Sequence, residues 1–585
     1  MTNTTEQDSF PRNRPAKPLP FELVQHVGIF FEEKLYTQAL TLLLSILTSS
    51  GVADTPTYIP SPQHLAVAAT FLVHPSTTTR AKTMEEEEAP SASLQLLHLT
   101  KALVGSTAAG FDSAFAFTHF ESSRRGRQRR ADDEPPTHEN SKPLNLDLGQ
   151  SASVWSRAED FWHAVGWAFN CSVRHRERWH RWQLWLELMC EVLEEDWAER
   201  VRQQRHHDDT AEHTATDAPR RRTTTTKKKK NSSNEFLKAS LIFRYISDGA
   251  GSYGRHRRIL RAIFADGGSS ACAEFREVFH NELKPLKRDT QAVKKRGVEV
   301  NIDEEQFGDY LIDDEDEDED DNDVSEPSTS TSATPVESAA PRRPVRQTKR
   351  PRRGRPSKDA TGSNDDAVST APSPSPSAAA NYALDDGSLL GGLPALALRQ
   401  RLLHLLSEVS EAVPDAFVNL EDLYQLFVEN IRHLPLPVFQ AFVSPTALPS
   451  FSPAALTTLC EVLLFRMRES AAPDTAEMYL TQAKLEHCFL PYAASTPSIV
   501  DNAKVSIALE SLLLLLADNH MLTVTPQLQE AVQVGVLARV DRVQVESKKS
   551  QANRQREEVE WNWLLESGER LMYLVKELLA APVPV

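Results

Sequence analysis

One short stretch of the chain is half cationic, and its chemistry is the clearest in the sequence. Between residues 341 and 358, nine of eighteen residues are Lys or Arg and none is acidic. Its centre, residues 349–358, reads KRPRRGRPSK. Lysine and arginine side chains neutralise phosphates and release the counterions held by nucleic acids. The composition therefore favours contact with a polyanion, and a solvated linker that binds nothing is the alternative.

The centre of this basic run resembles an AT-hook, a motif built on Arg-Gly-Arg-Pro with basic flanks. Ten of the 585 residues carry the resemblance, and an extra arginine between Pro351 and the core departs from the usual pattern. A glycine lets the backbone lie at the floor of a narrow groove, and flanking arginines extend along the negative A·T minor groove. The proline restricts the unbound chain and lowers the cost of ordering it. The resemblance implies a weak contact with A·T-rich DNA through Arg352, Arg353, Gly354, Arg355, Pro356 and Lys358.

Basic clusters also act as nuclear import signals, and this second interpretation is compatible with the first. Two further clusters lie in expected loops, at residues 123–130 and 220–230. Three such clusters favour a nuclear protein. The residues expected to direct import are Lys349, Arg350, Arg352, Arg353, Lys227, Lys228, Lys229 and Lys230.

The most acidic stretch lies upstream of the basic run. Residues 313–323 hold ten carboxylates in eleven positions, which is −10 of the net charge of −17. Such a run is most often a solvated spacer. Two functional alternatives stay open: contact with histones or other basic proteins, and masking of the basic run within the same chain, because a flexible linker allows the two to meet.

Other candidate sites are weaker. The glycine pattern at 249–254 follows a segment with helical spacing, whereas a dinucleotide site needs a preceding strand. His206, His207 and His213 have no closing ligands at metal-site spacing. The spacing of Trp179, Trp182 and Trp185 is that of a packed helix face, and the alternatives are a ligand cage or a groove for a partner. We find no catalytic motif and expect no enzyme and no cofactor, although an all-helical active site assembled from distant polar groups remains an alternative.

Composition limits the class of protein. Five widely spaced cysteines with no CxxC pair argue against a disulfide framework and against a cysteine zinc site. The first twenty residues have no apolar core typical of a signal peptide. The most apolar run, near residue 512, contains two carboxylates and is too short to cross a bilayer. We expect a soluble intracellular protein with no membrane partner.

Helical periodicity dominates the rest of the chain and predicts an all-α fold. Two helical blocks, bundle-like or irregular helical repeats, are expected to pack together with a long disordered acidic and basic segment looped out between them. The expected parts are a disordered tail at 1–18, helical hairpins at 19–120, a disordered insertion at 121–150, a Trp-rich helical pair at 151–202, a disordered basic insertion at 203–234, helices at 235–312, the disordered linker at 313–386 and a C-terminal helical domain at 387–585.

Residues 21–50 resemble a single tetratricopeptide-like helical hairpin. Tyr36, Ala39, Leu43 and Ile46 stand where that repeat has aromatic, small, large and small residues. The glycine of the preceding helix is offset by one position, and no second copy follows at the 34-residue period. The resemblance implies one helical hairpin, and a plain helical bundle is the alternative.

These observations together predict a nuclear, chromatin-associated helical scaffold. Its helical surfaces would bind protein partners, and the AT-hook-like segment would add a DNA contact. The alternative is a nuclear structural or assembly protein, for example in ribosome biogenesis, in which the basic runs serve only import.

Overall fold

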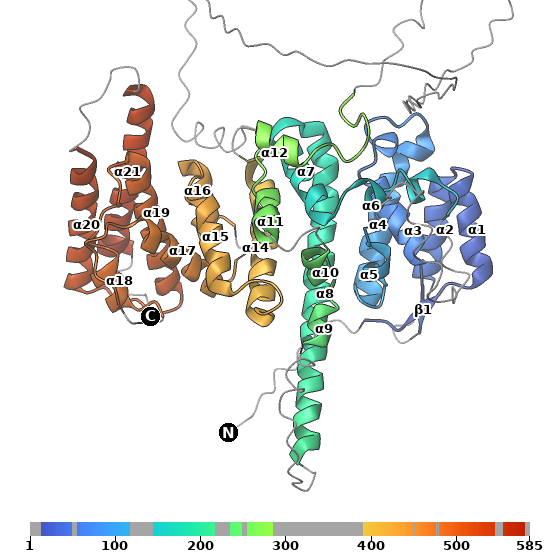
Figure 1. Ribbon diagram of the computed structural model, residues 1–585, viewed down its shortest axis with the longest axis horizontal. Coiled ribbons are helices and arrows are strands. Elements are labelled where there is room, and N and C mark those ends of the chain that lie inside the picture. Colours follow the sequence, from blue (N-terminus) through green and yellow to red (C-terminus); the bar gives the residue numbers. More distant parts are fainter. Residues whose placement is uncertain are drawn as a thin grey trace, which may run out of the picture. The chain divides into compact units, whose positions relative to one another are not determined.

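The computed structural model confirms the all-α fold for the residues that it describes. These residues form mostly helices joined by loops, with one pair of three-residue strands and one isolated β-bridge (Figure 1). All of them belong to one compact unit. The described residues are 13–49, 55–117, 144–216, 234–248, 254–284, 390–448, 451–475, 477, 479–544 and 554–578.

The N-terminal part contains the expected hairpin. Helices α1 and α2 contact each other, and Tyr36, Ala39 and Leu43 are buried. Helix α3 begins with an N-cap, since the Ser61 hydroxyl accepts a hydrogen bond from the His64 N–H and Pro62 occupies the first turn. The helices are α1 (Phe21–Glu32), α2 (Tyr36–Thr48), α3 (Pro62–Phe71), α4 (Met84–Val104) and α5 (Phe111–Ala114).

Helix α4 begins with a polar, acidic turn. Thr83 and Glu86 form a capping box, in which each side chain accepts a hydrogen bond from the other residue's backbone N–H. The Glu85 carboxylate accepts hydrogen bonds from the backbone N–H and the hydroxyl of Thr37, at 2.7 and 2.5 Å. Helix α4 is therefore joined to the start of α2 by its first, polar turn.

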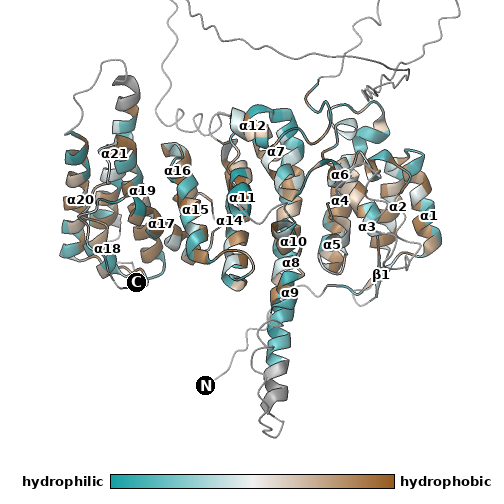
Figure 2. Ribbon diagram, viewed as in Figure 1, coloured by the Kyte–Doolittle hydropathy of each residue, from teal (hydrophilic) through white to brown (hydrophobic). Residues whose placement is uncertain are grey.

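The tryptophan-rich segment forms the core of the middle of the chain. Trp179, Trp182 and Trp185 are buried, as their spacing predicts. Helices α7 and α8 pack against each other, whereas residues 205–210 of α8 are exposed and hydrophilic (Figure 2). The elements are α6 (Val154–Arg157), α7 (Phe161–Arg174), α8 (Arg176–Thr216), α9 (Glu235–Lys238), α10 (Leu241–Ser247), α11 (Arg255–Ile263) and α12 (Ser269–Glu274).

The C-terminal block is built around α19. This helix is buried on almost every side and contacts α16, α17, α20 and α21, which accounts for its nearly continuous apolar sequence. A π-helical turn, Leu574–Leu578, follows the last helix. The helices are α14 (Gly392–Ala412), α15 (Leu420–Ile431), α16 (Leu436–Val443), α17 (Pro453–Met467), α18 (Gln482–Cys488), α19 (Ile499–Asp518), α20 (Pro526–Gln544) and α21 (Arg554–Tyr573).

Helix α14 joins the two helical blocks, as expected. It contacts α7, α8 and α11. The Arg401 guanidinium donates to both carboxylate oxygens of Glu194 on α8, at 2.8 and 2.6 Å. Arg399 is fully buried, lies 3.9 Å from the centre of the Phe169 ring and donates to the Ala265 carbonyl. Residues far apart in sequence thus share one core.

Three expected boundaries are wrong. The tail does not extend to residue 18, because β1 (Ala16–Pro18) pairs in parallel with β2 (Thr57–Ile59), with the α1–α2 hairpin as the crossover. Strands of three residues are too short for alternation to reveal them. The insertion at 121–150 ends by residue 144, where Leu144, Leu146 and Leu148 are buried against the N-terminal helices. The insertion expected from 203 does not begin there, because α8 continues to Thr216. The linker at 313–386 and residues 285–312 lie outside the described residues.

Candidate functional site

The residues that the sequence singles out for DNA contact and import, including the run at 349–358 and Lys227–230, all lie outside the described residues, as does the acidic run at 313–323. Their functions therefore stay predictions. Within the described residues the most distinctive feature is a basic pocket at the junction of three chain segments.

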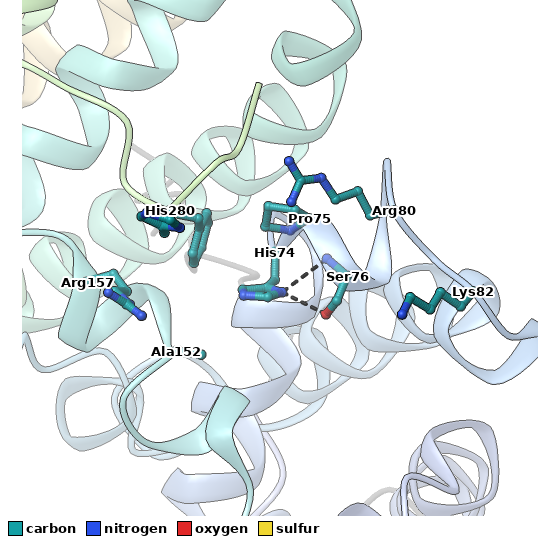
Figure 3. A pocket seen from close by; sticks show the side chains of 9 residues that line it. His74, Pro75, Ser76, Arg80, Lys82, Ala152, Arg157 and His280 are labelled. Carbon is teal, nitrogen blue, oxygen red and sulfur yellow. Dashed lines mark hydrogen bonds between the residues drawn. The ribbon is translucent and has the colours of Figure 1, made fainter. Parts of the chain in front are cut away.

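The basic pocket has a volume of about 380 Å³ (Figure 3). One wall is the turn after α3, with His74, Pro75 and Ser76, and its continuation carries Arg80 and Lys82. A second wall comes from Ala152 and Arg157, at the two ends of the α6 region. Phe279 and His280, which follow α12, complete the lining. The three segments are separated by about seventy to two hundred residues of sequence.

A buried ion pair holds two of these segments in place. Arg178 on α8 and Glu282 are 3 % and 2 % exposed, and the Arg178 Nε donates to Glu282 at 2.8 Å. The same guanidinium donates to the Val73 carbonyl and, at 2.9 Å, to the Thr78 hydroxyl. Arg178 therefore fixes the first wall of the basic pocket to the residues that follow α12.

The Glu282 carboxylate is fully used by hydrogen bonds. Besides Arg178, it accepts from Trp182 Nε1 at 2.7 Å, Trp167 Nε1 at 3.0 Å and the Phe279 N–H at 3.3 Å. A buried charge with this many donors is compensated. The pair thereby ties the Phe279–Lys284 segment to α7 and α8.

His74 is neutral in the folded protein. Burial is the main cause that lowers the pKa of His74 to about 3, and the charges of three neighbouring arginines act in the same direction. Its Nδ1 accepts from the Ser76 N–H at 3.2 Å and lies 2.8 Å from the Ser76 hydroxyl, so the ring proton is on Nε2 (Figure 3). The ring packs edge-on against Phe279, with 4.7 Å between centres.

The contact between His74 and Ser76 is not suited to activate a nucleophile. A histidine with a pKa near 3 is a weak base at neutral pH. Among the described residues no carboxylate orients the other ring nitrogen. The two residues are two positions apart and form the cap of a short 3₁₀ turn, which is a local structural role.

The charge of the basic pocket is unbalanced. Arg80 is engaged with backbone, donating through Nε to the Lys284 carbonyl at 3.1 Å and through Nη2 to the Asn281 carbonyl. Arg157 and Lys82 are exposed, and no carboxylate of the described chain pairs with either. The lining contains no Asp or Glu. An apolar floor of Pro75, Ala152 and Phe279 is thus flanked by cations, which suits an anionic ligand with an apolar part.

A second cavity, of about 320 Å³, lies between the residues before β1 and helix α8. Its charges are balanced internally. Ser106 donates to Glu195 at 2.9 Å, and Arg202 pairs with Glu199 at 2.7 Å. This cavity therefore lacks the excess charge of the basic pocket.

The remaining candidates from the sequence have structural explanations. Gly254 begins α11 with a φ of +82°, and the preceding element is helix α10, which does not fit a dinucleotide fold. No group of His, Cys, Asp or Glu side chains within the described ranges could hold a metal ion. None of the helices in the described parts is both long and apolar enough to cross a membrane.

Sequence reasoning missed the basic pocket altogether. Its cations stand singly, in the turn before α4 and at the end of α6, and nothing in their spacing distinguishes them from ordinary surface charges. Comparisons with protein-family models, curated proteins and solved structures found no match.

Proposed function

We propose that this protein is a nuclear, chromatin-associated scaffold without enzymatic activity that adds a weak A·T minor-groove contact to its protein interactions. The observation that carries the proposal is the Arg353-Gly354-Arg355-Pro356 core with its basic flanks. Two arginines around a glycine suit a narrow groove, and the flanking cations suit phosphates. Because this segment lies in the sequence between two helical blocks, we expect it to contact DNA at a distance from them.

The helical body supports the scaffold part of the proposal. Its aromatic residues are used internally, since Trp162, Trp182 and Trp185 are among the largest fully buried side chains. The outer sides of the last two long helices expose apolar side chains of the kind that protein partners cover. These are Val534, Leu537, Val559, Leu565 and Tyr573, each 47–57 % exposed.

The test compares two double variants of the full chain on A·T-rich and G·C-rich duplexes over a range of salt concentrations. Arg353→Ala with Arg355→Ala removes the core arginines. Arg342→Ala with Arg343→Ala is the matched control, because it removes the same charge from the same stretch but outside the core. We expect the first variant to lose its preference for A·T-rich DNA and the control to lose only a little affinity on both duplexes.

Equal losses in the two variants would show that charge alone binds DNA, and the minor-groove proposal would be wrong. An unchanged DNA affinity together with a changed cellular location would instead favour the nuclear assembly protein, with the basic runs as import signals.

A further inference from the structure

The basic pocket offers two cations, Lys82 and Arg157, whose side chains form no ion pair with a carboxylate of the described chain; the nearby Glu86 carboxylate accepts from the backbone N–H groups of Lys82 and Thr83. The ammonium group of Lys82 and the guanidinium group of Arg157 are exposed and form no ion pair there. Arg80, in contrast, is occupied by the backbone carbonyls of the segment after α12. The side chains of Lys82 and Arg157 are therefore available to a ligand, whereas Arg80 holds the wall of the pocket in place.

Between these cations the pocket is apolar. Pro75 and Phe279 are buried side chains at its floor, and the neutral His74 ring packs against Phe279. An apolar side chain of a ligand would gain free energy there by leaving water. The Nε2–H of His74 would remain as a donor.

We propose that the basic pocket binds an acidic segment of a partner protein, with one apolar side chain in the pocket and flanking carboxylates beside Lys82 and Arg157. This inference rests on the proposed scaffold function and names the partner's chemistry. Charge complementarity argues for it, because the lining has three permanent cations and no carboxylate. A volume of about 380 Å³ suits one or two side chains of a peptide.

The same features argue against a free inorganic anion as the ligand. A phosphate site usually brings several N–H donors to one point, often at a helix N-terminus. Here the free cations come from separate segments, and the space between them is apolar. A peptide with acids on both sides of an apolar residue matches this arrangement, whereas a compact anion would leave the apolar floor uncovered.

The probe is a fluorescein-labelled peptide with a central Phe flanked by three Asp or Glu residues on each side. Its affinity is measured by anisotropy with the full chain at physiological salt. Lys82→Glu with Arg157→Glu reverses both free cations at exposed positions, so folding should be retained. The matched control is Lys238→Glu with Lys576→Glu, which makes the same charge change at two exposed lysines that do not line the basic pocket.

We expect the pocket variant to bind the peptide at least about tenfold more weakly than the wild type, and the control variant to bind within about twofold. Both variants keep the basic run at 349–358, which also attracts acidic peptides, so the difference between them reports the pocket. Replacing the central Phe of the peptide by Gly should weaken binding about tenfold, because the apolar floor would stay uncovered.

Equal losses in the two variants, an affinity independent of the central Phe, or no binding to the wild type would each overturn the proposal. Tighter binding of a single-stranded oligonucleotide at the pocket residues would overturn it as well. A failure here is distinguishable from a failure of the proposed DNA contact, because Arg353→Ala with Arg355→Ala leaves the pocket intact and Lys82→Glu with Arg157→Glu leaves the DNA-binding core intact.

Discussion

Replacing the buried Glu282 by glutamine should be among the most destabilising single changes in this protein. The substitution keeps the shape of the side chain but removes its charge. One carboxylate oxygen of Glu282 accepts from Arg178 and Trp182, and the other accepts from Trp167 and the Phe279 N–H. Whichever oxygen becomes an NH₂ group then faces donors, so two or three N–H groups lose their acceptor.

The magnitude follows from two terms. A buried donor without a partner costs about 1–3 kcal/mol, and breaking one side of a buried ion pair costs about 3–5 kcal/mol in all. Arg178 is 3 % exposed and keeps only the Val73 carbonyl and the Thr78 hydroxyl as other partners. We therefore expect Glu282→Gln to lower the free energy of unfolding by about 3–5 kcal/mol.

The assay is urea unfolding followed by tryptophan fluorescence, because seven of the nine tryptophans lie between residues 155 and 197, close to this pair. Glu277→Gln is the matched control, since Glu277 is exposed and lies five residues earlier. We expect the control to change the free energy of unfolding by less than about 0.5 kcal/mol. A loss below about 1 kcal/mol for Glu282→Gln would refute the reasoning.

A double variant sharpens the interpretation. Arg178→Met combined with Glu282→Gln removes both charges, and an apolar or neutral pair in a buried site costs less than an unpaired ion. The double variant should therefore be less destabilised than the sum of the two single changes. Additive losses would show that the two charges do not stabilise each other.

Three further changes test other parts of the structure. Gly166→Ala should destabilise the protein by more than about 1 kcal/mol, because the new methyl group would lie within 2.7 Å of the buried Phe275 ring. This clash should outweigh the better helix propensity of alanine. Unfolding at or above the wild-type urea midpoint would contradict this prediction. Burial lowers the pKa of His64 to about 4, below its usual value of 6.5. Between pH 4 and pH 6.5 the imidazole is therefore protonated in the unfolded state and neutral in the folded state. Stability should be full above pH 6.5 and fall by up to about 1.4 kcal/mol per pH unit towards pH 4, and His64→Leu should remove that part of the slope; an unchanged pH dependence of the urea midpoint would refute it. Deleting residues 313–323 should raise DNA affinity at low salt if the acidic run masks the basic run, and an unchanged affinity would exclude masking.

Much of the fold follows from local rules that one sequence displays. Helical spacing places Trp179, Trp182 and Trp185 on one buried face, and Ser61 followed by Pro62 marks the start of α3. These features depend on neighbours within a few residues along the chain, so they can be read without knowing the rest of the molecule. The extent of α8 is less predictable, because its polar last turns have no apolar face to reveal them.

The pairing of charged residues that lie far apart in the sequence could not be predicted from local rules. Arg178 and Glu282 lie 104 residues apart, and in the sequence each is an ordinary charged residue among others. Only the packing of α7 and α8 against the segment after α12 removes both from water and makes each the other's partner. The two short strands also depend on a partner 41 residues away.

The sequence by itself determined the all-helical class, the buried tryptophan face and the AT-hook-like run, because each is encoded by residues close together in the chain. The tertiary structure alone decided that the two blocks form one unit and that Lys82 and Arg157 flank an apolar pocket. The physical reason is that the interaction energy of a charged side chain depends on its burial and on the groups around it. Those groups come from segments that only folding brings together.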